Sequence, residues 1–120
     1  MTENRFEVRE RPEESRYVLI DLDAAGPARN AIGEESYVDV ENPGSTHRVL
    51  FHTGVSEEYG GRGLAAFLVR TVVEDAIAKG YGIVPVCPYV AAWLPKHPEY
   101  AGHVVTPDPE HHRAVHAQQG

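Results

Sequence analysis

The sequence has a single cysteine and no long apolar run, and both shortages limit the kind of protein it can encode. With Cys87 alone the chain cannot form an internal disulfide, which agrees with a reducing compartment. No stretch approaches the ~18 consecutive apolar residues of a membrane-spanning helix. The charged N-terminal segment also lacks the apolar core of a signal peptide. We therefore expect a cytoplasmic protein with no membrane partner.

Negative charge outweighs positive charge, mainly in the first third of the chain. The whole sequence has 18 Asp and Glu against 11 Lys and Arg, a net charge of −7. Residues 1–42 hold 11 of the acidic residues and 5 of the basic ones, whereas all 7 histidines follow them. Because nucleic-acid binding needs a basic face, we expect no nucleic-acid partner. The acidic front could attract a cationic substrate such as an amine, or it could serve solubility.

The first half of the sequence has the alternating pattern of β-strands. Its 120 residues, 42% of them hydrophobic, suffice for one globular domain with one core. Alternation predicts three strands joined by short links, at residues 16–23, 31–41 and 46–55. Residues 24–30 are expected to form a loop. Short links between successive strands favour an antiparallel meander. A weaker alternation at residues 5–10 indicates a possible extra strand within an N-terminal extension, residues 1–15.

After residue 60 the apolar period becomes helical. It predicts a helix from Gly63 to Lys79, followed by a strand at residues 81–87. Because a helix supplies the crossover, this strand should run parallel to the one before it, which gives a mixed α/β sheet. Pro88 is suited to start a second, short helix. The expected domain spans residues 16–105, followed by a polar, frayed tail at 106–120.

The stretch 60-GGRG-63 stands directly before the predicted helix and suits the binding of an anion. A helix start presents free backbone N–H groups and the positive end of the helix dipole, which together favour phosphate. A nucleotide-binding Walker loop would end in Gly-Lys-Ser/Thr, which is absent here. A dinucleotide fingerprint fits formally but lacks the acidic residue expected ~20 positions later. A plain helix start remains an alternative, although one glycine would suffice for it.

Four pieces in order resemble the GNAT superfamily of acyl-CoA-dependent N-acetyltransferases, and in particular a short single-domain subfamily. They are the loop 60-GGRGLA-65 and the segments 52-HTGV-55, 87-CPYVAA-92 and 97-HPEY-100. The resemblance runs from about Tyr17 to Tyr100 and implies a GNAT-like fold. It also implies acetyl-CoA as cofactor, with its pyrophosphate on the loop amides of Gly61 to Leu64. The implied cofactor-binding residues are Val55, Gly60, Gly61, Arg62, Gly63, Leu64, Ala65, Cys87 and Pro88.

Two residues are the leading candidates for catalysis. His52 can titrate near neutral pH and could accept the amine proton, and strand alternation places it on the face of Leu50 and Gly54. Otherwise it is a structural histidine. Cys87 ends a strand before a helix start, where a thiol can be activated. It could carry the acetyl group, or it could be a small buried hydrophobe.

The sequence departs from the related pattern at three positions. Gly54 stands where the subfamily has a glutamate, the obvious base. Trp93 lies on the helix that often carries the tyrosine acid in GNAT enzymes, and its indole cannot take that role. We expect Tyr89 and Trp93 near the substrate pocket, with packing as the alternative for Trp93. Gly60 replaces the usual Arg or Gln of the loop.

The histidines of the tail raise the question of a metal site. His112 and His116 have the spacing of two ligands on one helical turn, but a frayed tail makes a metal site unexpected.

Three functions are left by the sequence. The first is an acetyl-CoA-dependent N-acetyltransferase acting on a small amine or an exposed peptide amine. The second is a CoA or acyl-CoA-binding module with weak or no turnover. The third is an unrelated phosphate-binding or protein-interaction domain.

Overall fold

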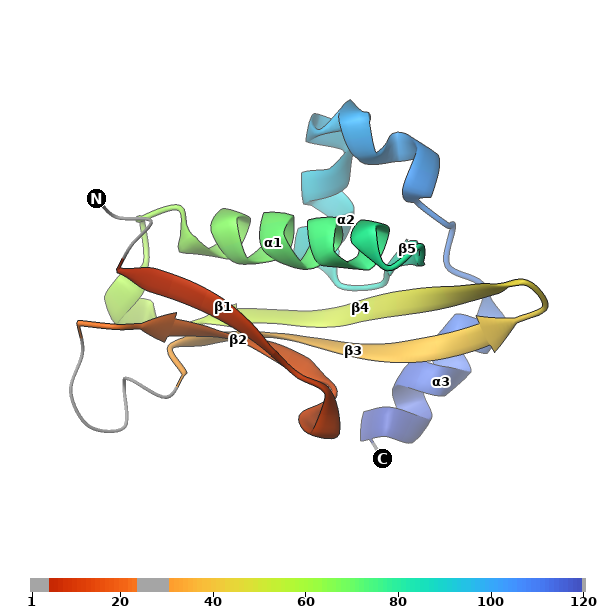
Figure 1. Cartoon of the computed structure of the whole chain (residues 1–120), viewed down its shortest axis with the longest axis horizontal. Helices are drawn as coiled ribbons and strands as arrows, with labels where there is room; N and C mark the ends of the chain where they lie inside the picture. Colours follow the sequence, from red (N-terminus) through yellow and green to blue (C-terminus); the bar gives the residue numbers. More distant parts are fainter. Residues whose placement is uncertain (1–4, 24–30, 120) are drawn as a thin grey trace.

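The strands form one five-stranded sheet in the order β1-β2-β3-β4-β5, as the computed structural model of residues 5–23 and 31–119 shows (Figure 1). Strands β1 to β4 are antiparallel in succession, and β5 pairs parallel to β4. The predicted meander followed by a parallel crossover is therefore confirmed. The strand bounds are Phe6–Arg11, Arg16–Asp21, Gly33–Asn42, Ser45–Val55 and Gly82–Pro85 for β1 to β5. The loop expected at 24–30 lies outside the described residues.

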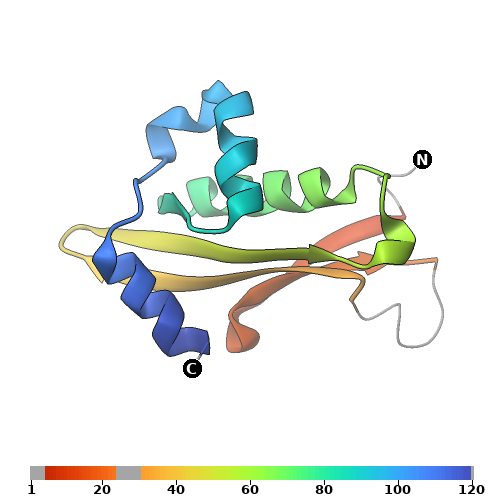
Figure 2. The same ribbon diagram turned by 180° about the vertical axis from the view of Figure 1, so that it is seen from behind.

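Helices cover both faces of this sheet (Figures 1 and 2). Helix α1 (Leu64–Ala78) and helix α2 (Pro88–Trp93) lie on one face, and helix α3 (Pro109–Gln119) crosses the other. The larger core lies under α1 and α2, where Leu68, Val69, Val72 and Val73 pack on the sheet with no exposure. Apolar burial of this kind is the main stabilising contribution to such a fold.

The frayed tail expected at residues 106–120 is not what the structure shows, because residues 109–119 form α3. The helix buries Val115 in a second, smaller core with Val40, Val49 and Val84. Asp108 caps its first turn by accepting hydrogen bonds from the backbone N–H groups of Glu110 and His111. The tail looks polar in sequence because only a narrow stripe of α3 is apolar. The valines on this face of the sheet supply the other half of the apolar contact that stabilises the helix.

The N-terminal residues 6–11 form the edge strand β1, which pairs with β2 along its full length. Within the described residues, no helix has the length and hydropathy needed to cross a membrane.

A buried charged cluster lies between the middle of the sheet and the end of α1. Arg48 on β4 is 4% exposed and donates two hydrogen bonds of 2.8 Å to Asp39 on β3. It donates another of 2.7 Å to the hydroxyl of Tyr17. Its guanidinium carbon lies 3.9 Å from the centre of the Tyr37 ring. Arg48 thus has a partner on each side and crosslinks β2, β3 and β4.

Candidate functional site

The glycine loop before α1 has an open backbone. Gly61 and Gly63 have φ angles of 78° and 73°, in the region that favours glycine. A Cβ atom added at either position would meet nothing within 4 Å, so conformation and not crowding requires the two glycines. Gly60 has an ordinary φ of −63°. Gly63 caps α1 without any side-chain hydrogen bond to the helix start. The backbone at Gly61 and Gly63, just before α1, therefore borders open space, as an anion site needs.

The β1 and β2 strands hold this loop in place. Tyr59 ends the short 3₁₀ turn Glu57–Tyr59, and its hydroxyl donates a 2.6 Å hydrogen bond to Asp21. Asp21 is fully buried and also accepts two hydrogen bonds from Arg5, at 2.9 and 3.0 Å. Arg5 and Tyr59 hold the pKa of the Asp21 carboxyl well below its usual value. Sequence reasoning missed this anchor, because its residues are far apart in the chain.

The strands β4 and β5 part next to the loop. Their last paired residues are Leu50 and Pro85. The carbonyl of Leu50 then accepts hydrogen bonds from the backbone N–H groups of both Val86 and Cys87, at 3.1 and 2.9 Å. The chain turns away into α2 at Pro88, whereas β4 continues to Val55. The result is a splayed pair of strands, with Cys87 where they part and the glycine loop after the far end of β4.

Cys87 lies where the two strands part and touches β4. Its side chain is 4% exposed, and its sulfur lies 3.2 Å from the hydroxyl oxygen of Thr53. Thr53 in turn donates a short hydrogen bond to a carboxylate oxygen of Glu35 on β3. Cys87, Thr53 and Glu35 therefore form a continuous chain of polar atoms between the sheet and α2.

Glu35 is the site residue that sequence reasoning missed. Its side chain is fully buried, and its second carboxylate oxygen has no hydrogen-bond partner among the described residues. Burial raises the pKa of Glu35 to about 8, although the Thr53 hydrogen bond acts in the opposite direction. A signal was present, since the alternation of Tyr37, Asp39 and Glu41 extends to Glu35. That alternation separates Glu35 from Glu34 by face, but it does not show which face is buried at this end of the strand.

His52 lies on a different face from the one predicted. The pairing of β3 with β4 is continuous up to Tyr37 and Leu50 and resumes at Ser36 and His52, which leaves Phe51 as an extra residue in a β-bulge. The bulge reverses the alternation, so His52 shares a face with Gly54 but not with Leu50. Its side chain is 54% exposed, and its Nε2 lies 3.5 Å from Glu34. It is Thr53, and not His52, that touches Cys87.

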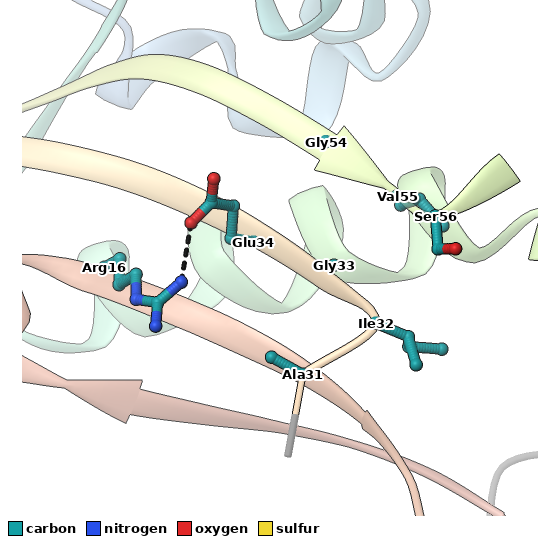
Figure 3. Close-up of a pocket in the computed structure, with 8 residues that line it drawn as sticks. All are labelled: Arg16, Ala31, Ile32, Gly33, Glu34, Gly54, Val55 and Ser56. Atoms are coloured by element: carbon teal, nitrogen blue, oxygen red, sulfur yellow. Dashed lines mark hydrogen bonds and ion pairs between the residues drawn. The ribbon is translucent and has the colours of Figure 1, made fainter. Parts of the chain in front are cut away.

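A pocket of about 400 Å³ opens at this end of the sheet (Figure 3). Gly54 and Val55 of β4 form one wall, and Glu34 lies opposite Gly54 on β3. Arg16 on β2 donates a 2.7 Å hydrogen bond to Glu34. Gly54 has no side chain, and the carboxylate beside it in the pocket comes from Glu34 on β3.

Tyr89 and Trp93, the residues predicted for a substrate pocket, lie on α2. Trp93 is 6% exposed and stacks on His97, with ring centres 3.8 Å apart, so packing is the role that its surroundings support. Tyr89 is 40% exposed on α2. Neither residue lines the pocket beside Gly54. Neither lines a second pocket, which lies between the end of β5 and the segment that follows α2. Within residues 5–23 and 31–119, no three His, Cys, Asp or Glu side chains are grouped to hold a metal ion.

Comparisons with known proteins identify the family. The family model described as GCN5-related N-acetyl-transferase matches residues 22–103. A GCN5-like protein of Staphylococcus aureus, solved by NMR, is 27% identical, with 90% of this chain and 96% of that chain covered and a TM-score of 0.62. A ribosomal-protein-alanine N-acetyltransferase from Brucella melitensis is 20% identical, with coverage of 78% and 66% and a TM-score of 0.48. A comparison with curated proteins gave no match.

The family match covers well over half of the sequence, and the Staphylococcus structure spans nearly all of the fold. The splayed strands β4 and β5, with the glycine loop between β4 and α1, occur within the matched residues. The chain belongs to the GCN5-related N-acetyltransferase family.

Proposed function

We propose that this protein transfers the acetyl group of acetyl-CoA to an amine, and that Cys87 carries the acetyl group between the two. The observation that supports it is the position of Cys87 where β5 leaves β4, with the open glycine loop after the far end of β4, which together would set a path for an extended cofactor along the freed edge of β4. Acetyl-CoA supplies an activated thioester. The open amides at Gly61 to Leu64 suit its pyrophosphate, and Arg62 adds a positive charge beside them.

The remaining residues of the predicted cofactor site agree with this path. Val55 ends β4 beside the loop, and Leu64 and Ala65 form the first turn of α1. Pro88 starts α2 and has no N–H, so the chain cannot continue the β-ladder there. These residues would hold the extended arm of the cofactor against the free edge of β4.

The acceptor would be a small amine or an exposed peptide amine that reaches the pocket beside Gly54. Glu34 gives this pocket a negative charge that suits an ammonium group. His52, 3.5 Å from Glu34, is the candidate that takes the proton the amine loses. Glu34 pairs across the strands with Gly54, the position at which the related sequence pattern carries its glutamate.

Native mass spectrometry of the protein after incubation with acetyl-CoA tests the proposal. We expect one acetyl group on Cys87, lost on addition of a suitable amine and absent in Cys87→Ala. His52→Asn should leave this loading intact and slow the loss to amine. Calorimetry with CoA and acetyl-CoA measures binding separately. Failure to bind either ligand at millimolar concentration would contradict the whole proposal.

A binding module without efficient turnover is the second candidate, favoured by the missing carboxylate at Gly54. It predicts binding of CoA and acetyl-CoA with no acetyl group passed to any amine in a panel. Amine acetylation that depends on acetyl-CoA but survives in Cys87→Ala would instead support direct transfer and refute the carrier role of Cys87.

A further inference from the structure

We propose that Glu35 and Thr53 form a proton relay for Cys87, in which the buried carboxylate of Glu35 receives the thiol proton through the hydroxyl of Thr53. The proposal rests on the acetyl-carrying role of Cys87 and adds the group that activates it. Glu35 acts through Thr53 and does not itself reach the thiol. It is therefore a positioning residue rather than a catalytic one.

The hydrogen-bond directions follow from the chemistry of the three groups. A hydroxyl has one proton to donate and lone pairs with which to accept. When Glu35 is ionised, Thr53 donates its proton to the carboxylate, so toward Cys87 it can only accept. The thiol must then be the donor across the 3.2 Å contact. The chain thus runs from the S–H of Cys87 to the O–H of Thr53 and on to the carboxylate.

The proton transfer is balanced within the protein. The thiol proton passes to the oxygen of Thr53 while the hydroxyl proton of Thr53 passes to Glu35. The thiol and carboxylate thereby become a thiolate and a carboxylic acid, and Thr53 is unchanged. The net charge of the chain of groups stays the same, which matters because new charge in a buried site is costly. The reverse transfer restores the thiol when the sulfur is released.

The surroundings of Glu35 suit a proton acceptor better than a structural ion. A buried carboxylate that serves structure is normally paired with a cation or fully hydrogen-bonded, and Glu35 has an oxygen with no partner in the described part of the chain. Burial raises its pKa to about 8, with a smaller contribution from the charge of Glu34. The carboxyl is therefore protonated below about pH 8, and it accepts the thiol proton in its ionised form, which is populated around pH 8 and above.

The same hairpin contains a natural control for this arrangement. Thr46 on β4 donates a 2.9 Å hydrogen bond to Glu41 on β3, the same pair of residue types in the same cross-strand relation. That pair is exposed and lies far from Cys87, near the hairpin turn. If the loss of any cross-strand threonine–glutamate hydrogen bond changed the reactivity of Cys87, removing the Thr46–Glu41 pair would change it as much as removing the Thr53–Glu35 pair.

The test measures the rate at which iodoacetamide alkylates Cys87 between pH 6 and pH 9, with no acetyl-CoA present. We expect Glu35→Gln and Thr53→Val to slow alkylation by about tenfold or more near pH 8 and to move the profile to higher pH. Thr53→Ser, which keeps the hydroxyl, should restore the wild-type profile. Glu41→Gln and Thr46→Val should not change it. Profiles of Glu35→Gln and Thr53→Val that coincide with wild type would overturn the relay.

A second measurement needs no variant that might fail to fold. The carbon-13 resonance of the Glu35 carboxyl is titrated in the intact protein and after alkylation of Cys87. Its midpoint should shift when the thiol is blocked, and an unchanged midpoint would contradict the coupling. The outcomes remain distinguishable from those of the proposed function. If the coupling is present and acetyl never loads, the carrier role fails alone; if acetyl loads and the coupling is absent, the relay fails alone.

Discussion

Two buried ionisable side chains lie on the α1 side of the β3–β4 hairpin, and their surroundings differ. Arg48 is enclosed by the carboxylate of Asp39, the hydroxyl of Tyr17 and the ring of Tyr37. Glu35 accepts a side-chain hydrogen bond from Thr53 and has an oxygen without a partner among the described residues. Both are less than 5% exposed.

This difference distinguishes a cluster that stabilises the fold from a group that suits a functional role, within one hairpin. Around Arg48 the charges and hydrogen bonds are satisfied, so the cluster fixes how three strands and α1 meet. Around Glu35 they are not, and an unsatisfied buried carboxylate is destabilising unless it is protonated. It lies where the strands part and next to the lone cysteine. We interpret the first cluster as part of the scaffold and the second as part of the proposed site.

The largest effect is expected from breaking the satisfied cluster. Arg48→Met would leave Asp39 and the Tyr17 hydroxyl without their cation, and we expect the free energy of unfolding to fall by about 3 kcal/mol or more. Urea denaturation measures this loss. Arg113→Met, on the exposed side of α3, is the control and should change stability by less than about 0.5 kcal/mol. A loss below about 1 kcal/mol in Arg48→Met would mean that the cluster is not structural.

The second effect is the pH dependence of stability caused by Glu35. Its pKa is about 8 in the folded protein, above the ~4.3 of an unfolded chain, so the folded state holds an extra proton between these values. The free energy of unfolding should therefore fall as pH rises from 5 to 8, by up to about 1.4 kcal/mol per unit from this group. Above pH 8 the contribution should level off.

Urea denaturation of wild type and Glu35→Gln at several pH values provides the measurement. The amide cannot ionise, so the variant should lose this slope and keep the dependence caused by other groups. Equal slopes in the two proteins would show that Glu35 ionises normally and is not the buried acid described above.

A smaller effect is expected at the glycine loop, which belongs to the open end of the hairpin. Gly63→Ala places a side chain on a backbone with φ of 73° and should lower stability by about 1 kcal/mol. It should also weaken CoA binding in calorimetry, since the loop must shift. Gly102→Ala, where an added Cβ would meet nothing within 4 Å and φ is not positive, is the matched control. Equal CoA affinity in both variants would argue against a role for the loop backbone.

The smallest effect is expected at the exposed threonine–glutamate pair. Thr46→Val and Glu41→Gln should each change the free energy of unfolding by less than about 0.5 kcal/mol, because exposed pairs contribute little. If either variant matched the effect of its buried counterpart, Thr53→Val or Glu35→Gln, burial would not be what distinguishes Glu35.

Most of the strand and helix positions could be predicted, because each depends on a local pattern. The alternation at residues 16–23 and the helical period from Gly63 to Lys79 are examples, and β2 and α1 lie within those bounds. The prediction for the C-terminal tail was wrong, since α3 is stabilised by valines of β3, β4 and β5 that are distant in the chain. The prediction for His52 was wrong in its face, since one extra residue at Phe51 reverses the alternation.

The sequence by itself determined the family, the glycine loop and the position of Cys87 between a strand and a helix. All of these follow from the order of residues along the chain, where glycine, proline and apolar spacing act locally. Only the tertiary structure decided which groups surround the thiol. Glu34 and Glu35 are neighbours of one residue type, yet one lies beside His52 and the other is buried behind Thr53. That distinction arises from strand pairing and from the layer of helices above the sheet, which exclude water from one carboxylate and leave the other partly exposed.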